Sequence, residues 1–180
     1  MIDLIELGQG VYAATKGITY WGEEEISFVK KVALETPRLR ARICAHRTGE
    51  DLLHEMLIAI SCKSYIHPHR HLIKSESFHV VEGIVDVIVL DERGEISEVV
   101  ELGPPGSGRI FYYRMSESKF HTLRIHSNIL VVHEVTNGPL EANGTVMAEF
   151  APKESNKNEV ALYEELLSKK IQLYQQGKLR

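Results

Sequence analysis

The feature that most restricts the fold is a series of short apolar segments with a period of two residues, which runs from about residue 38 to residue 150. β-Branched side chains recur at alternate positions, as expected of half-buried strands. Turn residues separate the segments, for example at 91–94 and 103–108. Such a series predicts a β-sandwich or small barrel rather than βαβ units. The predicted strands are 38–44, 56–62, 64–71, 76–82, 84–91, 95–102, 109–114, 119–125, 128–136 and 145–150.

Two helical patterns precede or interrupt the strands. Residues 23–35 carry apolar side chains at helical spacing behind an acidic first turn, and Pro37 ends this helix. A second, short helix is predicted over Glu50–Glu55, because the residues from Thr48 onward resemble an N-cap followed by acids.

A third helix is predicted at the C-terminal end of the chain. Over residues 156–177, apolar side chains follow one helical face, which predicts packing on the barrel or on a second subunit. This face is formed by Val160, Tyr163, Leu167, Ile171 and Tyr174. The predicted division of the chain is an N-terminal extension at 1–36, a β-barrel at 37–154 and a C-terminal amphipathic helix at 155–180.

Length and composition exclude several classes of protein. The 180 residues suit a single domain, and 43% hydrophobic with 26% charged residues is typical of a globular chain. The net charge of −4 and the lack of a Lys/Arg cluster predict no nucleic-acid partner. No apolar stretch approaches the roughly 18 residues that span a bilayer, and the N-terminus lacks a signal-peptide pattern. We expect a cytoplasmic protein whose cysteines, Cys44 and Cys62, are buried free thiols.

Residues 67–83 contain four of the nine histidines and predict a metal site. In a strand, His69 and His71 point to the same face, where two imidazoles can meet one ion. Glu76 begins the next strand and can add a carboxylate, and a distant third imidazole would complete the site. The alternative is that these histidines are ordinary satisfied groups, as a lone histidine on a strand usually is.

The same residues resemble the first motif of the cupin superfamily, HxH(x)3–4E(x)6G, with Gly83 as its closing glycine. Lys63 replaces the leading glycine of that motif. The second motif is degraded, but His121 stands where its histidine belongs. The resemblance therefore implies a single cupin domain, a double-stranded β-helix or jelly-roll barrel, with a short N-terminal helical segment and a C-terminal helix. It implies the metal ligands His69, His71, Glu76 and His121, with nearby His126 as the alternative to His121.

Over residues 25–154 the chain resembles more closely the WbuC family of cupin-fold metalloproteins, often encoded among polysaccharide genes. The resemblance is carried by the stretches 37–46, 64–71, 120–123, 133–139 and 149–154. It implies one divalent transition metal ion, either zinc, iron, manganese or nickel, and a sugar-like small-molecule ligand.

Several further side chains are candidates for the pocket. Glu134 is a candidate proton-transfer group, although a surface position is the alternative. Tyr65 and Tyr113 are candidates for lining the pocket with a hydroxyl group, and Tyr65 is also a candidate catalytic residue. His67 is predicted to line the pocket, whereas His79 has the opposite parity to Glu76 and should face outward.

The arginines at 38, 40 and 42 alternate and should share one strand face. This face is either an anion site, suited to the phosphates of a nucleotide sugar, or an edge strand protected by charge. The match to the family's Arg-x-Arg stretch favours Arg40, Arg42 and the following His46 as substrate-binding residues.

The expected function is that of a metal-binding cupin acting on a sugar or nucleotide sugar in surface-polysaccharide (O-antigen) metabolism, in the manner of an isomerase or epimerase. An Fe(II)-dependent dioxygenase and a non-catalytic small-molecule-binding or metal-binding protein are the alternatives. The amphipathic tail predicts a homodimer.

Overall fold

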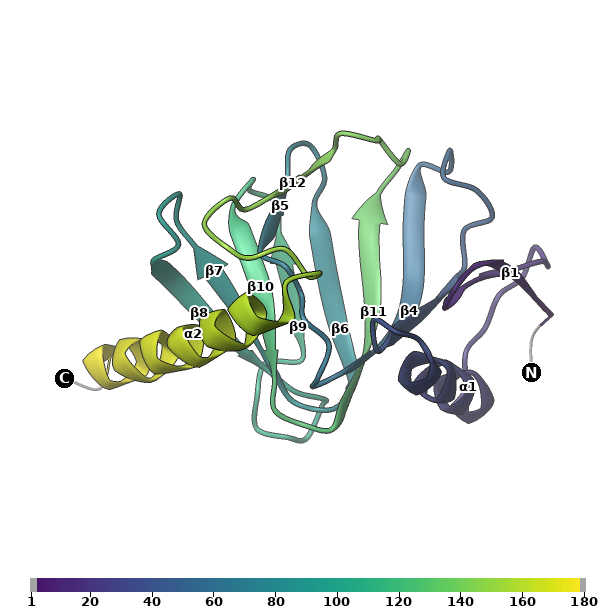
Figure 1. The fold of residues 1–180 in the computed structure, drawn as a ribbon. Helices are drawn as coiled ribbons and strands as arrows, with labels where there is room; N and C mark the ends of the chain where they lie inside the picture. Colours follow the sequence, from purple (N-terminus) through teal and green to yellow (C-terminus); the bar gives the residue numbers. More distant parts are fainter. Residues whose placement is uncertain (1–2, 179–180) are drawn as a thin grey trace.

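The computed structural model, which describes residues 3–178, shows two β-sheets that face each other, with a helix packed against the outside of each (Figure 1). The helices are α1 (Glu23–Glu35) and α2 (Lys157–Lys178). The strands are β1 (Leu4–Gly8), β2 (Val11–Ala14), β3 (Arg40–Cys44), β4 (Leu53–Ser61), β5 (His69–His71), β6 (Glu76–Glu82), β7 (Val85–Leu90), β8 (Ile96–Leu102), β9 (Tyr112–Met115), β10 (Phe120–Ile125), β11 (Ile129–Asn137) and β12 (Thr145–Met147).

The winding of the chain is that of a jelly roll. The seven-stranded sheet has the order β1-β2-β3-β4-β11-β6-β9, and the five-stranded sheet has the order β12-β5-β10-β7-β8. From β4 onward the chain passes repeatedly between the two sheets, and the strand pairs are antiparallel apart from β2 with β3. This architecture confirms the predicted fold class, a mainly β single cupin barrel with one helix before it and one after it.

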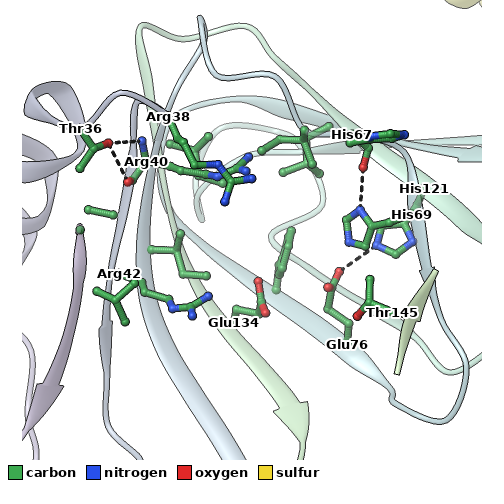
Figure 2. Close-up of a pocket in the computed structure, with 18 of the residues that line it drawn as sticks. Thr36, Arg38, Arg40, Arg42, His67, His69, Glu76, His121, Glu134 and Thr145 are labelled. Atoms are coloured by element: carbon green, nitrogen blue, oxygen red, sulfur yellow. Dashed lines mark hydrogen bonds and ion pairs between the residues drawn. The ribbon is translucent and has the colours of Figure 1, made fainter. Parts of the chain in front are cut away.

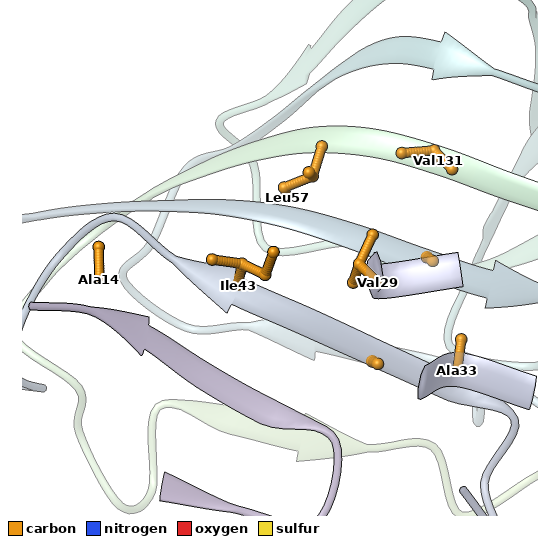
Figure 3. Packing of buried hydrophobic residues seen from close by; sticks show 8 residues of the cluster. Ala14, Val29, Ala33, Ile43, Leu57 and Val131 are labelled. Atoms are coloured by element: carbon orange, nitrogen blue, oxygen red, sulfur yellow. The ribbon is translucent and has the colours of Figure 1, made fainter. Parts of the chain in front are cut away.

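Strand alternation separates the barrel interior from the surface that α1 covers. On β4, Ile58 lines the interior, whereas its neighbour Leu57 faces α1. Val29 and Ala33 of α1 pack in one cluster with Leu57 and Val131 (Figure 3). The helix therefore buries its apolar stripe on the outer face of the seven-stranded sheet, as its sequence period predicts.

The outer face of the five-stranded sheet is covered in the same way by α2. Leu167 and Ile171 pack against Ile88 and Leu90 of β7 and Phe120 of β10. All six residues of β7 are buried, because the barrel interior lies on one side of this strand and α2 on the other. Neither helix within residues 3–178 has the length and apolar character required to cross a membrane.

The predicted helix over Glu50–Glu55 is wrong. The hydroxyl of Thr48 donates to a carboxylate oxygen of Asp51 at 2.8 Å, and the other carboxylate oxygen of Asp51 accepts from the Arg47 amide at 3.2 Å. These bonds close a turn that competes with a helix, and β4 begins at Leu53.

Other predictions near the N-terminus and the site also need correction. The strands β1 and β2 were not predicted, and the segment 64–68 is irregular, so that β5 begins only at His69. Of the two free cysteines, Cys44 is buried as expected, but Cys62 is exposed.

Candidate metal centre

Strand pairing brings the predicted metal ligands together inside the barrel. His69 of β5 lies directly opposite His121 of β10 in the antiparallel register, and His71 follows two residues later on the same strand face. The loop after His71 crosses to the other sheet, where Glu76 begins β6. One potential ligand atom from each of the four side chains lies within 4.8 Å of the others. Figure 2 shows His69, Glu76 and His121 of this group.

Hydrogen bonds on the far side of each imidazole orient the rings. Nδ1 of His69 donates to the carbonyl oxygen of His67 at 2.9 Å, and Nδ1 of His121 donates to that of Lys119 at 3.0 Å. Nδ1 of His71 lies 3.0 Å from the hydroxyl of Thr145. Because a carbonyl oxygen can only accept, Nδ1 carries the proton in His69 and His121, so the neutral form of each ring has its lone pair on Nε2, as metal-binding histidines require.

The residues fit a divalent transition metal ion. Nε2 of His121 is buried and makes no hydrogen bond with the described residues. It lies 3.5 Å from Oε1 of Glu76, and Nε2 of His71 lies 3.3 Å from Oε2. An unpartnered buried nitrogen is costly unless a ligand satisfies it. Three imidazoles and one carboxylate are a donor set that zinc, iron, manganese and nickel accept.

A buried hydrogen bond holds the carboxylate of Glu76 in its ionised form. The hydroxyl of Tyr113 donates to Oε1 of Glu76 at 2.6 Å. Although burial opposes ionisation, the neighbouring rings of His121 and His71 and this hydroxyl hold the pKa of Glu76 well below its usual value. Burial and the Glu76 charge raise the pKa of Tyr113 well above its usual value, so this tyrosine remains a proton donor.

The imidazoles of the cluster differ in their protonation. Burial, followed by the proximity of His121, lowers the pKa of His69 to about 4. Burial also disfavours protonation of His121, but interaction with Glu76 outweighs it and raises the pKa of His121. His69 is therefore neutral, and ready to bind a metal ion, over the whole physiological pH range.

A cavity of about 380 Å³ extends from these four residues to the inner face of β3. Its middle is lined by apolar side chains such as Ile58 and Phe78. At the far wall, Arg38, Arg40 and Arg42 line it (Figure 2). The predicted parity holds for Arg40 and Arg42 of β3, whereas Arg38 lies in the turn before this strand. The strand β3 pairs with both β2 and β4, so the alternative of a charge-protected edge strand is wrong.

Two of the three arginines share one carboxylate, that of Glu154. Glu154 accepts from Arg38 at 2.7 Å, and its Oε2 lies 3.4 Å from Nη2 of Arg40. Arg40 also donates to the carbonyl oxygen of Tyr65 at 3.0 Å. Within residues 3–178, Arg42 forms no salt bridge, and it points into the cavity beside Glu134 (Figure 2). Arg42 is therefore the arginine best placed to receive an anion.

Glu134 reaches the same cavity from β11. Burial, together with the negative charge of Glu76, raises the pKa of Glu134 to about 8, although the positive charge of Arg42 opposes this shift. The carboxyl group is thus protonated near neutral pH, at a point between the arginine wall and the histidine cluster (Figure 2).

The remaining predicted residues lie in different places. His67 lines the cavity, where its Nε2 lies 3.0 Å from the carbonyl oxygen of Ala148. Tyr65 does not line it: its hydroxyl donates to the carbonyl oxygen of Pro152 at 3.0 Å. His46 stacks on His54 with 4.1 Å between ring centroids and is likewise outside the cavity lining.

The two other histidines considered lie apart from the cluster. Nε2 of His126 contacts Oδ2 of Asp86 at 2.8 Å, so His126 is engaged elsewhere. His79 is exposed on the outer face of β6, as its parity predicts.

Sequence reasoning missed three contributors to the site. Thr145 orients His71, and the turn at Gln9–Gly10 between β1 and β2 lines the cavity. Glu154 occupies two arginines from more than 100 residues away in the sequence. No local pattern marks Thr145 or Gln9, whereas Glu154 falls in a stretch that carries the family resemblance.

Comparison with known families and proteins does not assign a function to this chain. The family described as "Domain of unknown function (DUF6016)" matches residues 22–102, and this match is not to the WbuC family. No curated protein matches the chain.

Similar solved structures include protein SO0799 from Shewanella oneidensis, with 10% identity and a TM-score of 0.48 over 58% of this chain and 70% of that one. The DMSP lyase DddQ from Ruegeria pomeroyi has 16% identity and a TM-score of 0.48 over 63% of this chain and 54% of that one. Oxalate decarboxylase from Bacillus subtilis has 15% identity and a TM-score of 0.44 over 54% of this chain and 24% of that one. At these identities and TM-scores we take nothing about activity from them.

Proposed function

We propose that this chain is a metal-dependent cupin related to the WbuC family, which acts on a small anionic sugar derivative such as a nucleotide sugar. The observation that carries the proposal is the single cavity that joins the histidine–glutamate cluster to Arg42 and Glu134. A ligand of this size can reach both ends, since small-molecule sites commonly occupy 300–1,000 Å³.

The residues that would hold the metal ion are His69, His71, Glu76 and His121. When bound, a divalent ion supplies a Lewis acid that polarises a carbonyl or hydroxyl oxygen of the substrate. The ligand types do not select among zinc, iron, manganese and nickel, because imidazole and carboxylate accept all of them.

The role proposed for Arg42 is to bind the anionic group of the substrate. Its guanidinium presents a planar set of donors that matches a phosphate or carboxylate. Arg38 and Arg40 share the wall, but both already pair with Glu154, so we assign them to positioning β3 and the substrate rather than to primary charge recognition.

Glu134 is proposed to move a proton at the carbon next to the polarised oxygen, which gives an isomerase-like or epimerase-like reaction. Its pKa of about 8 suits proton transfer near neutral pH. A divalent cation at the nearby cluster would favour the carboxylate and lower this pKa, so metal loading would prepare Glu134 to act as a base.

The proposal that the substrate is a sugar, and that it belongs to surface-polysaccharide metabolism, rests on the resemblance to the WbuC family. The chemistry of the cavity supports only the broader class of anionic small molecules. An Fe(II)-dependent dioxygenase is the second candidate, because a shell of three histidines and one glutamate also suits iron with an open position for oxygen.

The first experiment is elemental analysis of the freshly purified protein beside His71→Ala. We expect close to one equivalent of metal in the wild type and much less in the variant. Equal metal contents would refute the site. Zinc, manganese or nickel without oxygen uptake would exclude the dioxygenase, whereas iron with oxygen uptake would favour it.

The second experiment follows proton exchange in D2O by NMR, with UDP-glucose and other nucleotide sugars as probes. We expect wash-out of a ring proton with the wild type and none with Glu134→Gln. Binding of the probe with no exchange would support a non-catalytic binding protein. No binding to the metal-loaded protein would reject nucleotide sugars as the ligand class.

A further inference from the structure

The helix α2 carries apolar residues on two separate faces. Its inner face packs on the five-stranded sheet through Leu167 and Ile171. On its other side, Leu162, Leu166 and Leu173 are 58%, 50% and 68% exposed. We call these three residues the outer leucine stripe. Single exposed leucines are ordinary on protein surfaces, but an aligned set needs an explanation.

Helical geometry aligns the stripe. At 3.6 residues per turn, its three leucines fall within an arc of about 40°, roughly 140° around the helix from the buried residues of the inner face. Along the axis, Leu162 and Leu173 are about 16 Å apart. The barrel leaves this stripe uncovered, because α2 packs on the five-stranded sheet through its inner face. The bond from the Tyr174 hydroxyl to the Ser97 carbonyl oxygen at 3.0 Å also leaves the helix about 100° away from the stripe.

We propose that a second copy of this chain covers the outer leucine stripe, with the two α2 helices antiparallel about a two-fold axis. The spacing of the stripe is self-complementary in this arrangement. When Leu162 lies opposite Leu173 of the second copy, the symmetry repeats that contact at the other end. In the middle, Leu166 then lies opposite Lys169 of the second copy, whose aliphatic stem can pack on it.

The charges on α2 support the antiparallel direction. Glu159 and Glu165 lie in the first half of the helix, and Lys169 lies in the second half. Antiparallel pairing brings the acidic half of one helix to the basic half of the other and also opposes the helix dipoles favourably. The existing bond between Lys169 and Glu165, at 2.6 Å with both side chains 63% exposed, is weak enough to be exchanged for one between the copies.

This interface is independent of the proposed function, since it uses no residue of the cavity. Three leucines per copy form a contact smaller than the roughly 800 Å² per partner of a standard stable interface. We therefore expect concentration-dependent dimerisation with a Kd on the order of 10 µM.

Analytical ultracentrifugation of the full chain from 1 to 200 µM tests the interface. We expect the wild type to shift from monomer to dimer and Leu166→Lys to stay monomeric with an unchanged melting temperature. The matched control is Leu52→Lys, an equally apolar site that is 78% exposed in the loop before β4 and should still dimerise. Lys169→Leu should lower the Kd at least about tenfold, because the leucine added to the stripe contributes more to binding than the weak, exposed ion pair with Glu165 that it removes. A wild-type monomer at every concentration would overturn the proposal.

Disulfide trapping tests the direction of the helices. In a Cys62→Ser background, which removes the exposed native thiol, the double variant Leu162→Cys/Leu173→Cys should form a covalent dimer on mild oxidation. The single variant Leu162→Cys should not, because its two sulfurs would be about 16 Å apart and a disulfide requires Cα atoms within about 7 Å. Equal cross-linking of both variants would overturn the antiparallel arrangement.

Discussion

Removal and return of a metal ion should change the stability of this protein by a predictable amount. The cluster is already ordered, because Glu76 and His121 are 5% and 3% exposed and are held by hydrogen bonds. The folded chain should therefore bind the ion far better than the unfolded chain does. At an ion concentration of 100 times the Kd, binding stabilises the folded state by about 2.7 kcal/mol.

For a chain of 180 residues, each kcal/mol moves the melting temperature by about 2–4 °C. Adding the metal ion back to the chelated wild type should thus raise its melting temperature by about 5–11 °C. His71→Ala should weaken binding by at least the roughly 100-fold that loss of a supporting residue can cost. At the same ion concentration its stabilisation would then fall to about 0.4 kcal/mol, a shift of about 1–2 °C.

Differential scanning fluorimetry measures this shift, with zinc, manganese, nickel and anaerobic Fe(II) each added to chelated protein. His79→Ala is the matched control, since it removes an exposed histidine from the outer face of β6 and should respond as the wild type does. An equal shift in the wild type and in His71→Ala would show that the ions stabilise the chain elsewhere, and it would refute the assignment of the site.

Two further predictions concern stability measured by urea unfolding. Gly83→Ala should cost at least about 2 kcal/mol, because φ is +89° and the new Cβ would lie 2.5 Å from Oγ of Ser127 and 2.6 Å from the carbonyl oxygen of Ile129. Gly106 also has a positive φ, +88°, but a Cβ added there would meet no atom within 4 Å. Gly106→Ala should therefore cost only about 1 kcal/mol of unfolding free energy. Equal losses of stability in the two variants would contradict the steric reasoning. For Glu134, burial and then the Glu76 charge raise the folded-state pKa from 4.5 to about 8, so its contribution is fully present below pH 4.5 and is lost as the pH rises through 8. Metal-free Glu134→Gln should therefore lose less stability than the wild type between pH 6 and 9, and parallel pH profiles would count against a buried protonated carboxyl group.

The sequence alone was sufficient for the part of the candidate site that is local. His69 and His71 share a strand face by parity, and a four-residue connection brings Glu76 to the start of the next strand. Sequence spacing could not decide whether His121 or His126 is the fourth member of the cluster. The choice depends on the register of β10, which places His121 opposite His69 and leaves His126 beyond the strand end.

Parity failed where the backbone was not a strand. Tyr65 was predicted to line the pocket from a strand over 64–71, but the segment before β5 is irregular, and the buried Pro68 cannot supply the amide that a strand ladder needs. The Tyr65 side chain turns to Pro152 instead. Similarly, the residues from Thr48 onward resemble a helix N-cap but form a turn. Asp51 accepts hydrogen bonds from the Arg47 amide and the Thr48 hydroxyl, and β4 begins soon after.

The sequence by itself determined most of the strand series from β3 onward, the two flanking helices, the barrel class and the local metal-binding pattern. These follow from side-chain periodicity and turn chemistry, which act over a few residues. Only the tertiary structure decided which distant histidine completes the cluster, that Glu154 pairs with both Arg38 and Arg40, and that Arg42 stays available beside Glu134. The physical reason is that strand register and sheet packing, rather than sequence spacing, set the distances between side chains far apart in the chain.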